Sequence, residues 1–270
     1  MRQPQGPQRI VCLTEEPTEI LYTLGEGHRV VGISAYTVRP PEAKAEKPVV
    51  SAFIDGSVQK ICALQPDLVV GFSDIQADLA KKLIAANQQV LIFNQRSIQE
   101  ILEVVLAIGS LVGRQREAQS LCDTYLKRLD SVQKETAKQS HRPRVYFEEW
   151  DEPMITGIQW VSELVEVAGG QDVFRDRASG KLAKERFVQP EEVIAAEPEV
   201  IFASWCGKPF DEKAFRQRPG FDRLPAVRAG RVHEVPSELI LQPGPACLTA
   251  GLDCLLEGIA SLPIAPAPMP

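Results

Sequence analysis

The sequence lacks the patterns that mark several large classes of protein. No stretch approaches the roughly 18 consecutive apolar residues of a membrane-spanning helix, so no span is predicted. The six cysteines lie far apart, without a CxxC pair or Cys/His spacing typical of zinc, so no metal site is predicted. No run of lysine or arginine suggests a nucleic-acid patch, and the formal charge of -6 opposes phosphate backbones. Nucleic acid is therefore not an expected partner.

Motifs of common catalytic sites are missing as well. The sequence contains no GxSxG, no HExxH, no P-loop pattern and no GxGxxG placed between a strand and a helix. The three histidines, His28, His141 and His233, lie away from the predicted strand ends. We therefore expect no catalytic residues, and none of the histidines is expected to be a general base or a metal ligand.

The remaining composition is that of a globular protein. The 270 residues are 44% hydrophobic and 24% charged, which are ordinary proportions for this class. A chain of this length can bury one large core or two smaller ones, because single cores stop growing beyond about 250 residues.

The first half of the chain alternates predicted strands and helices. Residues 9–13 form an apolar strand, and the segment after it opens a helix that ends near Leu24, before Gly25. Because such alternation with short connections is typical of βα units, it predicts a parallel sheet covered by helices. The further elements expected are a helix over 58–64, a strand over 68–72, a helix over 78–86 and a strand over 89–93.

The second half repeats this order of elements. Segments 58–73 and 190–205 both contain an apolar helix that a proline ends, then an acidic residue and a buried strand. We interpret this match as internal similarity between two halves of the chain. The matched positions are Pro66 with Pro198 and Asp67 with Glu199; a strand from residue 144 and a helix over 160–168 complete the second half.

A long helical region separates the halves. Ser97 is a predicted cap, Gly113 interrupts, and a helix from Arg116 to about Gln139 has apolar residues at every third or fourth position. We therefore expect an α/β protein with two Rossmann-like lobes, each with a parallel sheet, joined by one long rigid helix. The expected boundaries are 1–96 for the N-terminal lobe, 97–140 for the helical connection and 141–270 for the C-terminal lobe.

Candidate ligand-binding residues follow the predicted strands, because ligands gather beyond the carboxyl ends of parallel strands. Two of the three tryptophans, Trp150 and Trp205, lie at such ends, and Trp160 lies at the start of a helix. Aromatic residues make up only 6% of the chain, and large flat side chains favour a bulky planar or ring-rich ligand. The other candidates at strand ends are Glu15, Glu16, Tyr36, Phe72, Glu149 and Cys206.

The acidic pairs leave a second interpretation open. Two carboxylates near a cleft can act as general acid and base. Glu15 and Glu16 precede a helix, where acidic residues also favour the helix dipole, whereas Glu148 and Glu149 have no such role. Cys206, without a histidine nearby in the sequence, is expected to be a soft ligand to a metal centre or to pack against Trp205 rather than to act as a nucleophile.

The order of several motifs resembles one known family, the cobalamin-type substrate-binding proteins of ABC transporters, which belong to a helical-backbone group that also takes siderophores and haem. The resemblance runs from about Arg9 to Leu262. The motifs that carry it are RIVCLTEEPTEILYTLG, VVGIS, ALQPDLVVG, SIQEIL, AGGQDVF and QPEEVIAAEPEVIF.

The resemblance implies two lobes joined by one long helix, with the ligand in a groove between them. The family's cleft aromatics correspond to Phe72 and Trp150, and Tyr36 and Trp205 lie at matching strand ends. It also implies that one surface acidic residue of each lobe docks on an ABC permease; the nearest candidates are Asp74 or Asp78 and Asp211 or Glu212. The expected ligand is cobalamin or another corrinoid, with no cofactor required, and we expect a monomer.

Two hypotheses of function follow. The first is a protein that binds a corrinoid, haem or a ferric siderophore without turnover. The second is a corrinoid-modifying or hydrolytic enzyme that uses Glu148 or Glu149. Family members are usually exported, whereas Met1 is followed almost at once by the first predicted strand, and six thiols are scattered through the chain. We therefore expect a cytoplasmic relative, or a periplasmic protein if a signal peptide has been removed.

Overall fold

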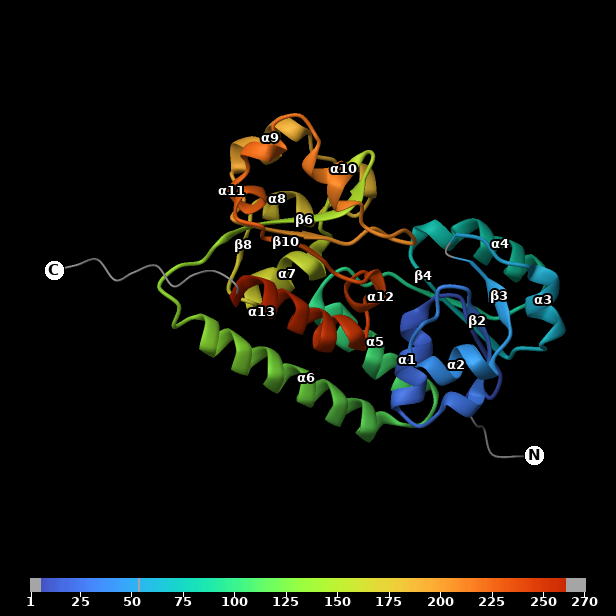
Figure 1. Cartoon of the computed structure of the whole chain (residues 1–270). Helices are drawn as coiled ribbons and strands as arrows, with labels where there is room; N and C mark the ends of the chain where they lie inside the picture. The colour runs from blue at the N-terminus through green and yellow to red at the C-terminus, as the bar shows by residue number, and fades with distance from the viewer. Residues whose placement is uncertain (1–5, 53, 261–270) are drawn as a thin grey trace. The chain divides into compact units, whose positions relative to one another are not determined.

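The computed structural model describes residues 6–52 and 54–260, and Figure 1 shows the order of the elements. The chain divides into two compact units: Met1–Leu126 with Gln242–Pro245 forms unit 1, and Lys127–Leu241 with Ala246–Pro270 forms unit 2. Each unit is described by itself below. The lobe boundaries expected at residues 96 and 140, and the groove expected between the lobes, stay predictions.

Unit 1 is built on a five-stranded sheet in the order β3-β2-β1-β4-β5, in which every neighbouring pair is parallel. The sheet confirms the α/β class expected from the alternating pattern. The direction of strand addition reverses between β1 and β4, and open parallel sheets bind ligands beyond the strand ends at such a point. The strands are β1 (Ile10–Cys12), β2 (Val30–Ser34), β3 (Val49–Ser51), β4 (Leu68–Phe72) and β5 (Val90–Phe93).

The helices of unit 1 begin and end close to the positions expected from the sequence. α1 ends at Thr23, and Gly25 follows with a φ of 76°, a left-handed conformation that favours glycine. Ser97 caps α5 as predicted, because its hydroxyl accepts from the Glu100 amide while the Glu100 carboxylate accepts from the Ser97 amide. The helices are α1 (Glu15–Thr23), α2 (Pro41–Glu46), α3 (Val58–Ala63), α4 (Ala77–Ala85) and α5 (Ile98–Leu111), with short 3₁₀ turns η1 (Gly27–Arg29) and η2 (Asp74–Gln76).

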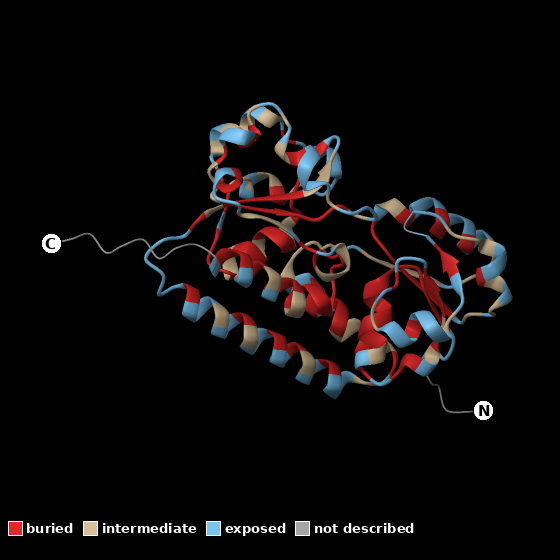
Figure 2. Cartoon of the chain, viewed as in Figure 1, coloured by how far each residue is buried: buried red, intermediate tan, exposed pale blue. Residues whose placement is uncertain are grey.

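The predicted long helix is α6 (Gln115–Thr136), which has 22 residues. It shows one buried stripe and otherwise faces solvent (Figure 2). The stripe follows the spacing of three and four expected for an amphipathic helix, and its buried members include Ala118, Cys122, Tyr125 and Leu129.

Unit 2 contains a second sheet in the order β10-β9-β6-β7, with β8 also paired to β6. β6 is parallel to β8 and β9, but β7 is antiparallel to β6, so the sheet is mixed where an all-parallel one was expected. The strands are β6 (Arg144–Asp151), β7 (Met154–Thr156), β8 (Gln171–Asp172), β9 (Val200–Ala203) and β10 (Val232–Glu234). The helices are α7 (Gln159–Val167), α8 (Arg175–Ala178), η3 (Ala183–Arg186), α9 (Pro190–Ala196), α10 (Glu212–Arg216), η4 (Phe221–Arg223), α11 (Pro225–Arg228), α12 (Ser237–Ile240), η5 (Cys247–Gly251) and α13 (Leu252–Ala260).

The internal similarity has a physical basis in both sheets. Asp67, just before β4, accepts a hydrogen bond from the Arg9 amide, and Glu199, just before β9, accepts one from the Arg144 amide, both at 2.9 Å. The backbone amides of the two acidic residues donate in return to the carbonyls of Arg9 and Arg144. The repeated acidic residue therefore connects the start of one central strand to the start of its neighbour in each unit.

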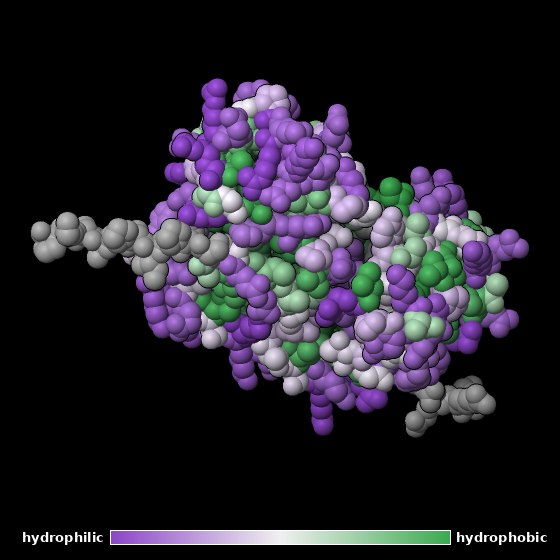
Figure 3. Space-filling model, viewed as in Figure 1, coloured by the Kyte–Doolittle hydropathy of each residue, from purple (hydrophilic) through white to green (hydrophobic). Residues whose placement is uncertain are grey.

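Three buried aromatic side chains lie among aliphatic ones in a core cluster of unit 2. Phe215 packs edge-to-face on Phe221, with ring centroids 5.1 Å apart, and both are fully buried together with Tyr146. Core aromatics bury the most apolar area per residue, so this cluster fixes the loop that carries Arg218. Figure 3 shows that hydrophilic side chains gather on the visible face over α9 and α10.

Candidate functional site

The carboxyl end of β6 is longer than the sequence analysis expected. Glu148 to Asp151, expected to follow the strand, lie within it, because β7 turns back and pairs with them. A β-bulge at Glu149 interrupts this pairing, since Glu148 faces Thr156 and Trp150 faces Ile155. The indole Nε1 of Trp150 donates to the carbonyl of Glu152 at 2.9 Å, which fixes the ring at the strand end.

Trp205 follows β9, the neighbour of β6, so the two tryptophans come from adjacent strand ends. Gly207 has a φ of 77°, which a turn of the chain there requires, and the turn carries Lys208 back over Trp205. The Lys208 ammonium lies 4.5 Å from the ring centroid of Trp150 and 4.7 Å from that of Trp205. Trp150 and Trp205 are called the indole pair below.

Asp151 holds this lysine in place. Both of its carboxylate oxygens lie 2.7 Å from the Lys208 Nζ. A cation over an aromatic face contributes about 0.5–1 kcal/mol at a partly exposed site, and a surface ion pair contributes a similar amount. One lysine therefore contacts the rings of two adjacent strand ends and the Asp151 carboxylate.

Glu148 contacts the indole of Trp205 and is fully buried. Its carboxylate accepts four hydrogen bonds: two from the Arg218 guanidinium, one from the Tyr146 hydroxyl at 3.0 Å and one from the Trp205 indole at 3.1 Å. Burial raises the pKa of Glu148, and the bonds from Arg218 oppose that effect. These four bonds use the acceptor capacity of the Glu148 carboxylate, and they orient both Trp205 and Arg218.

Glu149 points away from Glu148 and pairs with a different arginine. Both of its carboxylate oxygens accept from the guanidinium of Arg186, which is itself buried and also donates to the Thr156 carbonyl. The neighbouring thiol of Cys206 is part-buried, and burial raises its pKa, which disfavours the reactive thiolate. Each of the two carboxylates considered for acid–base catalysis, Glu148 and Glu149, is therefore paired with an arginine. This pairing indicates structural roles rather than acid–base roles.

A cavity of about 510 Å³ opens beside this strand end within unit 2. It combines apolar and polar walls, as ligand pockets commonly do. The lining includes Asp151, Met154, Val188, Trp205 and Arg218.

The corresponding strand end of unit 1 carries a similar arrangement. Phe72 ends β4, and the Arg96 guanidinium lies 5.1 Å from its ring centroid. The same guanidinium donates to Asp74 at 3.2 Å. An aromatic ring, a cation and an aspartate thus meet at the carboxyl end of a central strand in both units.

The other candidates of unit 1 lie at the point where its strand order reverses. Glu15 and Glu16 begin α1 directly after β1, and both are almost fully buried. Glu15 accepts from the amides of Val38 and Arg39 at 3.0 and 2.8 Å, so it holds the loop that follows β2. Tyr36, in that loop, is 41% exposed.

Glu16 lies in a tighter environment than Glu15. The Thr14 hydroxyl donates to it at 2.8 Å, and burial raises its pKa to about 7. Gly244 also packs closely on its side chain, because a Cβ at position 244 would lie 2.7 Å from the Glu16 Cβ. A glycine at 244 therefore permits residues 242–245 to pack on the start of α1.

The remaining predicted residues are Trp160 and the four acidic candidates for docking on a permease. Trp160, at the start of α7, is buried and donates to the Ile240 carbonyl at 2.9 Å. The four acidic residues expected to dock on a permease are all exposed: Asp74 pairs with Arg96, Asp211 caps α10, Glu212 pairs with Arg216, and Asp78 lies in the first turn of α4. Ligand contact by Trp160 and docking by these acids stay predictions.

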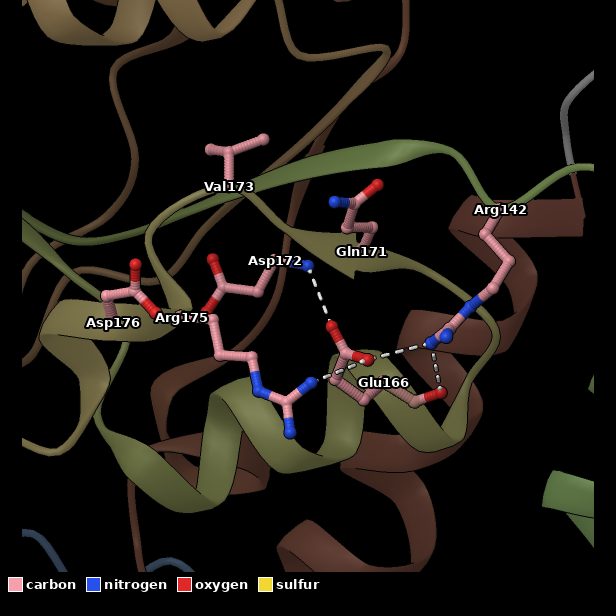
Figure 4. Close-up of a pocket in the computed structure, with 7 residues that line it drawn as sticks. All are labelled: Arg142, Glu166, Gln171, Asp172, Val173, Arg175 and Asp176. Atoms are coloured by element: carbon pink, nitrogen blue, oxygen red, sulfur yellow. Dashed lines mark hydrogen bonds and ion pairs between the residues drawn. The ribbon is translucent and has the colours of Figure 1, made fainter.

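A second cavity, of about 370 Å³, lies at the opposite end of β6 (Figure 4). Glu166 is at its centre and binds Arg142, Arg175 and the Asp172 amide. β8 begins here opposite Arg144, the first residue of β6. These charged side chains pair with one another and connect β8 to α7. We therefore interpret the residues that line this cavity as a structural network of ion pairs.

Sequence reasoning missed the cations of the site. Lys208, Arg186 and Arg218 carry no motif, and Arg218 lies 70 positions from Glu148 in the chain. Gly207 was the one available signal, because a glycine after a predicted strand end indicates a turn that brings the next residue back. Within 6–52 and 54–260, no group of three or more His, Cys, Asp or Glu side chains is placed to hold a metal ion.

None of the helices among the described residues is long and apolar enough to cross a membrane. All six cysteines, which lie in that part of the chain, are free thiols.

Known proteins similar to the chain agree with this architecture. An uncharacterized ABC transporter substrate-binding lipoprotein of Bacillus subtilis, YvrC, is 28% identical over 94% of this chain and 80% of its own length. A vitamin B12-binding protein of Vibrio parahaemolyticus is 26% identical over 90% of this chain and 86% of its own length. The structure of the periplasmic haem-binding protein RhuT from Roseiflexus sp. RS-1 superposes with a TM-score of 0.78, at 22% identity, over 94% of this chain and 100% of that one.

These relatives are described as a lipoprotein and a periplasmic protein, so they give no support to the cytoplasmic location expected from the thiols and the N-terminus. The family model for periplasmic binding proteins matches residues 10–239. That match confirms the predicted resemblance, and with it the expectation of a binding protein rather than an enzyme. The chain therefore belongs to the periplasmic binding protein family, whose members are substrate-binding proteins.

Proposed function

We propose that the chain binds a bulky metal chelate as the substrate-binding component of an ABC-type uptake system. Cobalamin or a related corrinoid is the first candidate, because a relative that aligns with 90% of the chain is a vitamin B12-binding protein. Haem and ferric siderophores are the alternatives, and they present the same kind of large ring or metal-chelate surface.

The indole pair is the observation that carries the proposal. Trp150 and Trp205 lie at adjacent strand ends; Trp205 lines the cavity of about 510 Å³, and Trp150 precedes Asp151, which lines it as well. Two flat aromatic faces next to a cavity favour stacking or enclosure of a ring-rich ligand. Phe72 and Tyr36 are proposed to contribute from unit 1, because they follow parallel strands near the point where the strand order reverses.

The partner and the location form part of the same proposal. An ABC permease is the proposed partner, with Asp74, Asp78, Asp211 and Glu212 as the docking candidates on the exposed surface. The proposed location is outside the cytoplasm, because the relatives are described as a lipoprotein and a periplasmic protein.

Replacing Trp150 with alanine tests the indole pair. We expect Trp150→Ala to weaken binding of the chelate by about 1–3 kcal/mol, the usual scale for losing an aromatic contact. The measurement is a titration of the parent and the variant with cyanocobalamin, cobinamide, Fe(III) protoporphyrin IX and ferric siderophores, followed by ligand absorbance and tryptophan fluorescence.

Tyr22→Ala is the matched control. Tyr22 lies near the end of α1, remote from the strand ends at which that helix begins, so its loss should leave affinity unchanged. Failure of the parent to bind any of these chelates would overturn the proposed function. Unchanged affinity in Trp150→Ala would show that this ring only packs.

A further inference from the structure

The position of Lys208 determines what can stack on the indole pair. Its ammonium lies over the faces of both Trp150 and Trp205, within 5 Å of each ring centroid. A flat ligand that stacks on the ring faces beneath the ammonium must displace it. The lysine is exposed enough to move, since 39% of its side chain is accessible, whereas Trp205 is only 5% exposed.

A ligand that displaces the Lys208 ammonium from the indole rings leaves it with Asp151 as its remaining partner. An ammonium has three N–H donors, and the two Asp151 oxygens at 2.7 Å can accept from two of them. The ammonium also lies over the indole rings, and it loses that cation–π attraction when a ligand covers them. A ligand that brings its own carboxylate replaces the lost interaction with a charge-assisted hydrogen bond, which is roughly twice as strong as a bond to a neutral acceptor.

Among the positively charged residues near the indole pair, Lys208 is the one that we expect to interact with a ligand carboxylate. Glu148 is saturated by Arg218, and Glu149 is paired with Arg186, so these two arginines already have carboxylate partners. Unit 1 independently repeats the arrangement, with Arg96 over Phe72 and bound to Asp74. A cation over an aromatic ring, held by an aspartate, is thus built into a central strand end of both units.

We infer that Lys208 is a specificity-determining residue, which admits to the indole pair chelates that carry a carboxylate on their rim and disfavours neutral ones. Among the chelates proposed above, it therefore favours haem, which carries two carboxylates, over cobalamin, whose rim carries amides. The inference rests on the proposed function, because it takes the indole pair as the stacking surface. Lys208 swings from the ring faces to the rim of the ligand and keeps Asp151 as its second partner.

Two ligands with the same ring and different charge test this inference. Fe(III) protoporphyrin IX carries two carboxylates, and its dimethyl ester carries none. The parent should bind the diacid about tenfold more tightly than the diester, given the difference between charge-assisted and neutral hydrogen bonds. Lys208→Met keeps the length of the side chain without its charge, and should bring the two affinities to within about twofold of each other.

Lys213→Met is the control, because Lys213 is an exposed lysine of α10 in the same unit. It should keep the tenfold preference, and equal melting temperatures should show that all three proteins are folded. A parent that binds both ligands equally, a Lys208→Met variant that keeps the preference, or a parent that binds cyanocobalamin but neither porphyrin would each overturn this inference alone. A parent that binds no chelate at all would overturn the proposed function and, with it, the inference.

Discussion

Glu148→Ala is expected to lower the free energy of unfolding by about 3–5 kcal/mol, the scale for breaking a buried ion pair by removing one partner. The substitution leaves the part-buried Arg218 guanidinium, whose side chain is 18% exposed, without its carboxylate. It also removes the acceptor of the buried Tyr146 hydroxyl and of the Trp205 indole. Urea unfolding of the parent and the variant at one pH measures the loss.

Two further variants define the cause of that loss. Glu191→Ala removes an exposed glutamate of α9 in the same unit and should change the free energy of unfolding by less than about 0.5 kcal/mol. Glu148→Ala combined with Arg218→Met removes both charges and should regain part of the lost stability, because the unpaired cation is gone. A single variant that loses less than about 1 kcal/mol would contradict the structural role of this carboxylate.

Glu16 is expected to make unit 1 less stable as the pH rises from about 4.5 to about 7. Its pKa is 4.5 in a model compound and is raised to about 7 in the fold, chiefly by burial. The folded state therefore binds the proton more tightly than the unfolded state does. The stabilisation is complete below pH 4.5 and is lost as the pH rises to about 7, by roughly 3 kcal/mol in total at 1.36 kcal/mol for each pKa unit.

Glu16→Gln removes this titration and provides the measurement. The difference in unfolding free energy between Glu16→Gln and the parent should increase in favour of the variant across this pH range and stay constant above it. Glu103→Gln, at an exposed position of α5, should follow the parent at every pH. A parallel pH profile for the parent and Glu16→Gln would show that Glu16 is not held as a buried acid.

The elements that could be predicted from the sequence depend on interactions between residues that are close together in the chain. Alternating helices and strands, the cap at Ser97 and the amphipathic stripe of α6 each depend on residues within a few turns. The repeated proline and acidic residue could also be read from the sequence, and the structure shows their role in Asp67 and Glu199. The β7 hairpin was missed, because the apolar pattern ended before the residues that β7 pairs with.

The site could be predicted only in part. Trp150 and Trp205 stood out because tryptophan is rare and both follow predicted strands. Their cations did not, because Lys208 and Arg218 reach the site through turns and tertiary packing. The sequence likewise gave no sign that two adjacent glutamates, Glu148 and Glu149, bind different arginines, since the β-bulge between them arises from pairing with β7.

Oxidative footprinting of the parent tests most directly whether a chelate binds at the indole pair. Hydroxyl radicals modify accessible side chains, and mass spectrometry measures the extent at each residue with and without saturating ligand. The chelate that binds most tightly in the titrations should strongly reduce modification of Trp150, while Ile84, which is 62% exposed on α4, should be modified equally in both samples. Unchanged modification of Trp150 at saturation would contradict the account, because the ligand would then bind elsewhere.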